Sequence, residues 1–289
     1  MFLNKQAGTN SIDNKGFDYY MKLAEGWKDP LPAPVIKELP LGGRFIIDES
    51  EIKIGSKARF GDLLFSTIKE KTVVYCQPRF GWAGISLTHL AKRHNKKLVL
   101  FMPASKQASQ HQLTCIENGA KPIFCRIAAM PNLNGYAKKY AEENKAFFIP
   151  LGLKHELVTA SIVKVAYELF ENRRPKEMWT VISTGVLTRG LQIALPKTKF
   201  VAVAVARNIQ NGELGKADFI SYDKPFAWQM KESPLPGLDT ALNYDAKGLD
   251  LFLKMAPRGS YFWNVAGEIK PKKLKPENIN SYKNWGDND

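Results

Sequence analysis

The sequence predicts an α/β fold in which mostly parallel strands alternate with helices. Short apolar runs rich in β-branched residues recur at 72–76, 97–104, 121–127 and 146–152. The segments between them have the apolar spacing of amphipathic helices, and Gly or Asn ends each one, at 83–95, 109–120 and 132–144. Such alternation indicates βαβ units, which build a parallel sheet covered by helices on both faces.

The alternation continues in the second half of the chain. A long helical pattern at 155–172 is followed by a strand at 178–183, a Gly-containing turn, a helix at 187–194 and a strand at 199–207. Between 208 and 245 the pattern weakens into a stretch rich in Pro, Gly and Asp, which predicts loops and short strands. A helix at 245–256 and a strand at 260–267 precede a polar tail.

The composition describes a basic globular protein. Its 289 residues are 44% hydrophobic, enough for one large domain or two closely packed ones. Lysine and arginine number 42 against 28 acidic residues, so the formal net charge is +14. Such a surface attracts polyanions, which makes nucleic acid or a phosphate-bearing substrate a candidate partner. A role of the charge in solubility alone is equally compatible with the sequence.

The cysteines predict a reducing compartment. Cys76, Cys115 and Cys125 are odd in number, lack metal-ligand spacing and lie in or beside apolar runs, so we interpret them as reduced core residues. The four histidines are also scattered without ligand spacing, and no metal site is predicted. No signal-peptide pattern and no apolar run of membrane-spanning length occurs. We therefore expect a cytoplasmic protein without a membrane partner.

Loops that follow strands are where open α/β sheets bind ligands, and the first candidate is "GSKARF" at 55–60. It places Lys57 between an extended segment and a helix. Partial burial, aided by the nearby charge of Arg59, would lower the pKa of Lys57 and favour an amine that attacks a carbonyl. An ordinary surface lysine is the alternative.

The second and third candidates are Gly-containing turns between a strand and a helix. "CQPRFGWAG" at 76–84 offers backbone N–H groups to a carboxylate or phosphate, with Arg79 as a charged partner. "ISTGVLTRG" at 182–190 offers N–H groups, hydroxyls and a helix dipole that suit a phosphate. The turn at 182–190 is neither a Walker loop nor a dinucleotide fingerprint. A capped helix start and a nucleotide-dependent enzyme remain alternatives for it.

The fourth candidate is "LNYDAKGLDLF" at 242–252, where Tyr244 and Asp245 begin a helix. Asp245 can be a simple N-cap residue, or it can present its carboxylate to a ligand.

In this order the four loops resemble the fold-type II pyridoxal-phosphate enzymes, most closely the branch of aminocyclopropane-carboxylate deaminase and D-cysteine desulfhydrase. The resemblance covers about Pro32 to Gly267. "GSKARFGDLL" is similar to the family's "GNKxRKLEYLL", and "LNYDAKGLDLFLK" to its "DPVYxGKAMxGL". "VISTGVLTRGLQIALP" occupies the place of its phosphate-binding "GSGGTxxGL", and "CQPRFGWAGISLTHLAKRH" that of its glycine-rich loop and helix.

The resemblance implies a pyridoxal 5'-phosphate cofactor that forms an aldimine with Lys57. Asp245 would keep the pyridine nitrogen protonated, and Tyr244 would be a catalytic residue near the reactive carbon. Trp82 falls near the place of an asparagine that contacts the cofactor in the family, and Arg79, Phe80 and Gly81 would bind substrate. The phosphate would be held by Ser183, Thr184, Gly185, Val186, Leu187 and Thr188.

Two three-layer α/β domains with the cofactor in a cleft between them are implied as well. The larger would comprise 1–60 and 166–289, and the smaller, inserted domain 61–165. The expected activity is of the lyase, deaminase or decarboxylase type on an amino acid, and the expected assembly is a homodimer. The charge of +14 favours an amino-acid-like group attached to nucleic acid, as in viral DNA modification in a host cytoplasm. A non-catalytic nucleic-acid-binding protein on the same scaffold is the alternative.

Overall fold

The computed structural model describes residues 15–40, 42–105, 107–126, 130–205, 209–210 and 212–269. It divides into two compact units. Among the described residues, one unit comprises 15–60 together with Glu156–Glu268, and the other comprises Gly61–His155 together with Ile269. We expected the second boundary at 165/166, inside a helix; it lies at 155/156 instead, so the helix that follows stays whole and packs on elements of the first unit.

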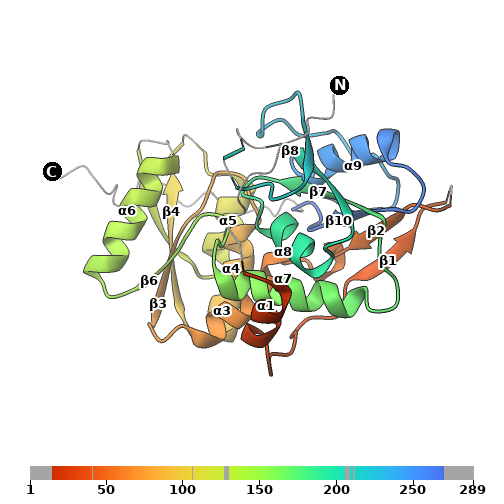
Figure 1. Ribbon diagram of the computed structural model, residues 1–289. Helices are drawn as coiled ribbons and strands as arrows, with labels where there is room; N and C mark the ends of the chain where they lie inside the picture. The colour runs from red at the N-terminus through yellow and green to blue at the C-terminus, as the bar shows by residue number, and fades with distance from the viewer. Residues whose placement is uncertain are drawn as a thin grey trace. The chain divides into compact units, whose positions relative to one another are not determined.

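The first unit contains a six-stranded sheet in the order β1-β2-β10-β7-β8-β9, in which only the pair of β1 and β2 is antiparallel (Figure 1). Its strands are β1 (Val35–Glu38), β2 (Phe45–Asp48), β7 (Glu177–Ile182), β8 (Lys199–Ala204), β9 (Asp218–Ser221) and β10 (Ser260–Asn264). Its helices are α1 (Phe17–Leu23), α2 (Lys57–Phe60), α7 (Glu156–Leu169), α8 (Val186–Ala194) and α9 (Asp245–Met255), with a 3₁₀ turn at Ser50–Ile52.

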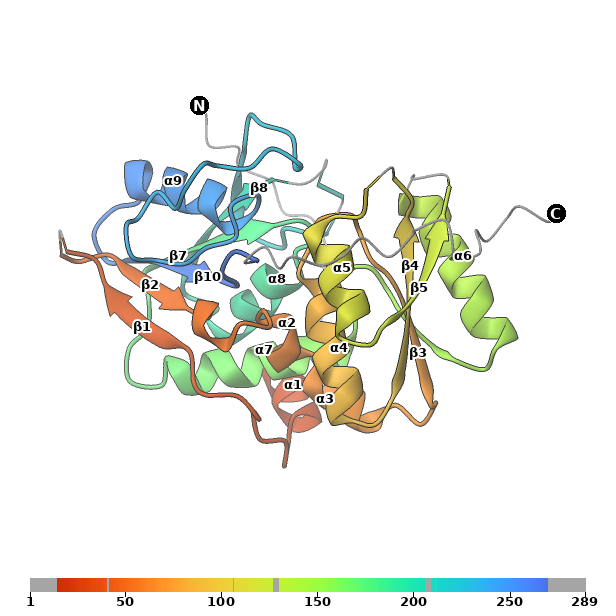
Figure 2. The same ribbon diagram turned by 180° about the vertical axis from the view of Figure 1, so that it is seen from behind.

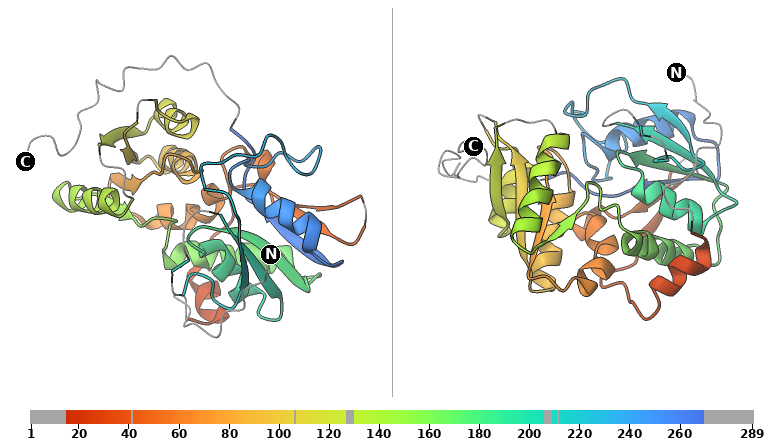
Figure 3. Two further views of the ribbon diagram at one scale, coloured as in Figure 1. Left: turned by 90° about the horizontal axis from the view of Figure 1, so that it is seen from above. Right: turned by 60° about the vertical axis from the view of Figure 1, so that its left-hand side comes forward.

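Helices cover both faces of this sheet, and successive side chains of β7 contact helices on alternate faces. Trp179 and Val181 point to one face, where they join the apolar cluster that contains Phe252 of α9. Thr180 points to the other face and shares a hydrogen bond of 2.8 Å with Thr188 of α8. In Figure 3, α9 in blue and the green helices α7 and α8 lie on opposite sides of the strands. The first unit is therefore a three-layer α/β sandwich.

The second unit contains a four-stranded, fully parallel sheet in the order β5-β4-β3-β6. Figure 2 shows α4 and α5 on one side of this sheet and α6 on the other. Its elements are α3 (Asp62–Thr67), β3 (Thr72–Cys76), α4 (Ala83–Arg93), β4 (Lys97–Pro103), α5 (Gln110–Glu117), β5 (Lys121–Cys125), α6 (Met130–Glu143) and β6 (Phe147–Ile149). All three cysteines are buried free thiols here, as expected.

The prediction of an α/β fold with mostly parallel sheets is confirmed. The strands and helices expected from the apolar pattern occur, with ends shifted by a few residues. The structure adds α1, which the sequence pattern did not predict, and it locates β9 in the weak stretch, where loops and short strands were expected. None of the helices in the described part of the chain is both long and apolar enough to cross a membrane.

Candidate active site

The candidate site lies in the first unit, at the carboxyl ends of three neighbouring strands. The strands β2, β10 and β7 are adjacent and parallel, and they end at Asp48, Asn264 and Ile182. The chain continues from β2 to Lys57, and from β7 to the turn at 183–185. Ligands of open α/β sheets bind at this kind of edge, because the loops after parallel strands converge there.

The backbone after β10 supports the residues around it. Carbonyl groups of residues 264–266 accept hydrogen bonds from the N–H groups of Glu49 at 3.0 Å, Ser56 at 2.9 Å and Ala241 at 3.0 Å. Ser56 precedes Lys57, and Ala241 lies in the loop that leads to Asp245. One short segment therefore holds the two loops that carry the expected amine and carboxylate.

Lys57 is the first residue of α2, directly after a turn at Gly55 and Ser56. Gly55 has a positive φ of 74°, a conformation that favours glycine, and its carbonyl accepts the N–H of Ala58 at 3.0 Å. The Lys57 side chain is half-buried and has no hydrogen bond or ion pair with a residue that the structure describes. Burial lowers the pKa of Lys57, and the negative charge of Asp245 offsets part of this effect.

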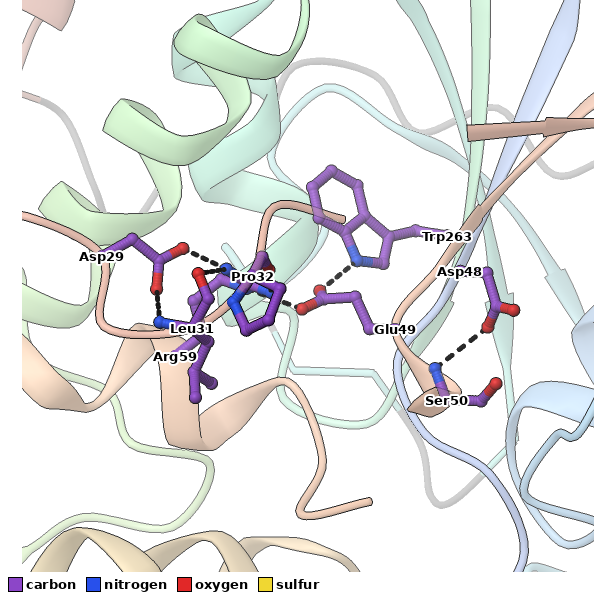
Figure 4. Close-up of polar contacts among 8 residues, drawn as sticks. All are labelled: Asp29, Leu31, Pro32, Asp48, Glu49, Ser50, Arg59 and Trp263. Atoms are coloured by element: carbon purple, nitrogen blue, oxygen red, sulfur yellow. Dashed lines mark hydrogen bonds and ion pairs between the residues drawn. The ribbon is translucent and has the colours of Figure 1, made fainter. Parts of the chain in front are cut away.

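Arg59 does not have the expected role of lowering the pKa of Lys57. Its guanidinium is fully buried and donates through Nε to Glu49 at 2.7 Å and through Nη1 to Asp29 (Figure 4). These two carboxylates neutralise its charge, so the burial of Lys57 is the dominant cause of the shift. The sequence could not reveal this pairing, because both carboxylates come from other elements.

Asp245 is a fully buried carboxylate at the start of α9. Neither of its carboxylate oxygens has a hydrogen-bond partner among the described residues. Burial raises the pKa of Asp245 well above its usual range, while the charge of Lys57 and the N–H groups near Val265 and Ala266 partly oppose the rise. A buried acid without a partner is costly for a protein, so it marks a place where a ligand group would be stabilised.

Tyr244 lies in the same loop, but its hydroxyl is already engaged. It donates a hydrogen bond of 3.1 Å to the backbone carbonyl of Val181 on β7. Burial and the neighbouring Asp245 raise the pKa of Tyr244 above its usual range. The structure therefore places the phenol against the end of β7, and its predicted catalytic role stays a prediction.

The turn after β7 has the features expected of an anion site. Gly185 adopts a positive φ of 70°, and a Cβ atom added there would lie 1.9 Å from the carbonyl oxygen of Glu213. Gly185 is the N-cap of α8 and supplies no side chain to the N–H groups of Val186, Leu187 and Thr188. These groups are therefore available to an anion.

The side chains of the turn differ in their availability. Thr188 is buried, and its hydroxyl is bonded to Thr180 on the sheet side. Behind the turn, buried Arg189 donates to the carbonyls of Thr184 at 3.0 Å and Glu213 at 3.1 Å. Arg189 thus fixes the shape of the turn, a role that the sequence analysis did not predict. Ser183 is half-buried, and Val186 is buried.

In the second unit, Gln77 organises the loop between β3 and α4. This fully buried side chain accepts the N–H of Gly84 at 2.7 Å and donates to the carbonyl of Gly81 at 2.8 Å. A Cβ atom on Gly84 would lie 2.6 Å from the Gln77 side chain, so only glycine fits there. Sequence reasoning missed Gln77, although a polar residue directly after a buried strand is a usable signal.

The expected ligand-contacting residues of this loop have distinct environments. Arg79 is exposed and lies over the ring of Phe80 at 5.6 Å, and Gly81 has a φ of 150°. Trp82 is the N-cap of α4, and its buried indole N–H has no hydrogen-bond partner in the described chain. The rings of Phe80 and Trp82 both meet buried His111 edge-on. Their roles in substrate and cofactor binding remain predictions.

Several solved enzymes share this fold. An ACC deaminase homologue has a TM-score of 0.73 at 15% identity, covering 86% of this chain and 94% of that protein. Diaminopropionate ammonia lyase from Escherichia coli has a TM-score of 0.66 at 14% identity, covering 92% and 93%. A pyridoxal 5'-phosphate-dependent aspartate racemase has a TM-score of 0.67 at 14% identity, covering 89% and 97%.

At these identities the likeness establishes the fold alone, and it confirms the expected α/β fold of the fold-type II pyridoxal-phosphate enzymes. No known protein family matches the sequence, and no curated protein matches it either.

Proposed function

We propose that this chain is a pyridoxal-phosphate-dependent enzyme that acts on an amino acid or amino-acid-like group, with Lys57 as the residue that attaches the cofactor. One observation carries the proposal. The half-buried amine of Lys57 and the buried carboxyl of Asp245 belong to loops that the backbone after β10 holds together, and neither forms a hydrogen bond or ion pair with a described side chain. Each influences the pKa of the other.

The residues of the first unit fit this cofactor. An aldehyde reacts with a neutral amine, and the lowered pKa of Lys57 increases the neutral fraction. A pyridine nitrogen requires an acidic partner in a low-dielectric environment, and the two unpartnered oxygens of Asp245 provide it. A phosphate requires free N–H groups at a helix start, and the turn at Gly185 leaves those of α8 uncapped.

The chain's own residues then have separate roles. Lys57 supplies a larger fraction of neutral amine at neutral pH than an exposed lysine does. Asp245 holds a proton at the pyridine nitrogen, and α8 stabilises the phosphate through its dipole. When bound, the cofactor ring accepts the electron pair that remains when a bond at the substrate's Cα or Cβ breaks.

The reaction class that we propose is deamination, β-elimination or replacement, or decarboxylation. Two solved proteins of this fold, an ACC deaminase homologue and diaminopropionate ammonia lyase, support deamination and elimination. Tyr244 is the proposed acid or base nearest to Asp245. Its hydroxyl would first have to leave the carbonyl of Val181.

A spectroscopic experiment tests the proposal. Purified protein mixed with pyridoxal phosphate should develop a visible band that borohydride removes, and mass spectrometry should then locate the reduced label on Lys57. The Lys57→Ala variant should give no band. Lys247→Met is the matched control, because Lys247 is also a buried lysine with a lowered pKa in the same unit. A label on Lys247, or none, would overturn the proposal, and amino acids that shift the band would identify substrates.

A row of lysines in the second unit supports a nucleic-acid partner as a second candidate function. Lys71, Lys97, Lys121 and Lys145 begin or precede the four parallel strands, and all are exposed. None forms an ion pair with another described residue. Neighbouring strands lie about 4.8 Å apart, so the row presents regularly spaced charges to a polyanion.

The row lies at the end of the strands opposite the loop at 77–84. A nucleic acid bound there would be held at a distance from that loop. It would need a flexible extension to bring an attached amino-acid group to it.

Fluorescence anisotropy with labelled DNA at low and physiological salt tests this function. Lys97→Glu/Lys121→Glu should weaken binding and reduce its salt dependence, whereas Lys138→Glu/Lys254→Glu changes the total charge equally and should bind like the wild type. Equal loss in both variants would contradict a specific surface. DNA binding by a protein that takes up no cofactor would favour the non-catalytic alternative.

A further inference from the structure

A buried polar network is centred on Arg59, which shares the short helix α2 with Lys57. The guanidinium donates through Nε to Glu49 at 2.7 Å, through Nη1 to Asp29, and through Nη2 to the carbonyl of Pro32 at 2.6 Å (Figure 4). The second oxygen of Glu49 accepts the indole N–H of Trp263 at 2.7 Å. Arg59 and Glu49 are both almost completely buried, at 0% and 1% exposed.

This network connects the short helix that begins with Lys57 to the strand beside Asp245. Trp263 lies on β10, and the backbone directly after it accepts hydrogen bonds from Glu49 and Ser56. The backbone N–H groups of Val265 and Ala266 favour the charged form of Asp245 and so lower its pKa. Arg59, through Glu49 and Trp263, therefore links the backbone of the lysine to the backbone that faces the carboxylate.

The helix α2 needs such anchors, because it has only four residues. A single helical turn does not hold its own conformation in water, so tertiary contacts decide where its side chains point. At its end, the hydroxyl of Ser161 donates to the carbonyl of Phe60 at 2.6 Å. In its middle, the side chain of Arg59 is the anchor.

We propose that the ion pair of Glu49 and Arg59 is the positioning device that sets the amine of Lys57 relative to the carboxylate of Asp245. This inference rests on the proposed function of Lys57. Buried ion pairs are seldom better for stability than an apolar pair of equal volume, so we assign this pair a role in defining the local geometry rather than in stability. The fork of Arg59 holds two chain segments, 29–32 and Glu49, at defined distances from α2, which an apolar side chain would not do.

The same unit offers a control. Glu177, at the start of β7, accepts the indole N–H of Trp179 at 2.6 Å through one oxygen and the ammonium of Lys199 at 3.0 Å through the other. It is a buried carboxylate with a tryptophan and a cation, like Glu49, although its lysine partner is exposed, and it lies at the opposite end of the sheet from Lys57. Glu177→Gln should therefore lower the stability of the protein without disturbing the lysine.

The experiment measures the chemical reactivity of Lys57 in the full-length, cofactor-free protein. Competitive labelling with acetic anhydride, followed by peptide mass mapping, gives the reactivity of each lysine across a range of pH. In Glu49→Gln and Arg59→Lys, the reactivity of Lys57 relative to exposed Lys138 should change by about tenfold, with a shifted pH midpoint, because displacement of α2 alters the burial of the amine and its interaction with Asp245, which together set its pKa. In Glu177→Gln it should stay within about twofold, although the melting temperature falls.

An unchanged reactivity of Lys57 in Glu49→Gln would overturn the proposal, and so would an equal change in Glu177→Gln. Arg59→Lys keeps the charge but loses the fork, so wild-type reactivity in that variant also counts against it. The rate at which added pyridoxal phosphate labels Lys57 is the second measurement. If the wild type accepts no cofactor, the proposed function fails, and the anhydride result still decides the positioning role.

Discussion

The backbone N–H of Ser56 donates to the carbonyl of Val265 at 2.9 Å, which fixes the turn before Lys57 to the end of β10. The N–H groups near Val265 and Ala266 also favour the charged form of Asp245. The loops of Lys57 and Asp245, which are far apart in the sequence, are therefore both supported by the backbone that follows β10. The electrostatic pairing of amine and carboxylate follows from this backbone arrangement, and the predictions below test its parts.

Asp245→Asn should make the cofactor-free protein more stable than the wild type, and this difference in the free energy of unfolding should grow as the pH rises. The pKa of Asp245 is raised in the folded state, so the wild type loses stability above the pKa of the unfolded carboxyl, about 4, until the folded pKa is reached. The variant lacks this loss and should be more stable by about 1–2 kcal/mol near neutral pH, and nearly equal at acidic pH. Urea unfolding at several pH values measures the difference.

Asp250→Asn is the control on the same helix, because Asp250 pairs with Lys254 at 2.8 Å at the surface. Its effect should stay within about 0.5 kcal/mol at every pH. An Asp245→Asn variant that is less stable than the wild type throughout would mean that the carboxylate has a partner in the folded protein.

Gly185→Ala should destabilise the protein and weaken the turn. The added Cβ would lie 1.9 Å from the carbonyl oxygen of Glu213, and the residue would keep a φ of 70°. Steric overlap and backbone strain together should cost more than about 2 kcal/mol. Gly259→Ala is the control, since Gly259 has a φ of 89° but open space around it, and should cost only about 1 kcal/mol. Equal losses in thermal unfolding would contradict the contact with Glu213.

Gln77→Leu should loosen the loop between β3 and α4. The substitution leaves the N–H of Gly84 and the carbonyl of Gly81 without their partner, at a cost of about 1–3 kcal/mol. Hydrogen exchange at the Gly84 amide should accelerate. Gln77→Glu keeps the acceptor for Gly84 and should retain slower exchange there, so similar rates in both variants would refute this account.

Lys247→Met should remove a pH dependence from the stability of the protein. The Lys247 ammonium donates to the carbonyl of Pro225 at 2.8 Å, lies 5.8 Å from the ring of Trp228, and has its pKa lowered by burial to about 8. Because this pKa lies below the unfolded value of about 10.4, the wild type should lose stability as the pH falls from about 10 to 8. The variant should lack this change, which is expected to be on the order of 1 kcal/mol.

The fluorescence of Trp228 provides the measurement, since this residue is partly exposed beside the ammonium. A pH titration of the folded wild type should show a transition near the pKa of Lys247 that Lys247→Met abolishes. The same transition in the variant would assign it to another group.

The amino-acid pattern alone predicted most elements of both sheets, because strand and helix periodicity are local properties of the chain. The segment that became α1 was missed, since its aromatic residues give no clear helical stripe. It is held from outside, where Tyr19 bonds to Glu156 of α7 at 2.7 Å and Tyr20 is buried. The edge strand β9 has only four residues, too few for a periodic signal.

For the candidate site, the amino-acid pattern was enough to locate the loops of Lys57 and Asp245 and the turn at Gly185, because each follows or precedes a recognisable strand or helix. The partners of the nearby residues became visible in the folded chain, where Glu49 neutralises Arg59 and the hydroxyl of Tyr244 donates to the carbonyl of Val181. Periodicity depends on neighbouring residues, whereas burial and hydrogen-bond partners depend on segments that meet only when the sheet is assembled.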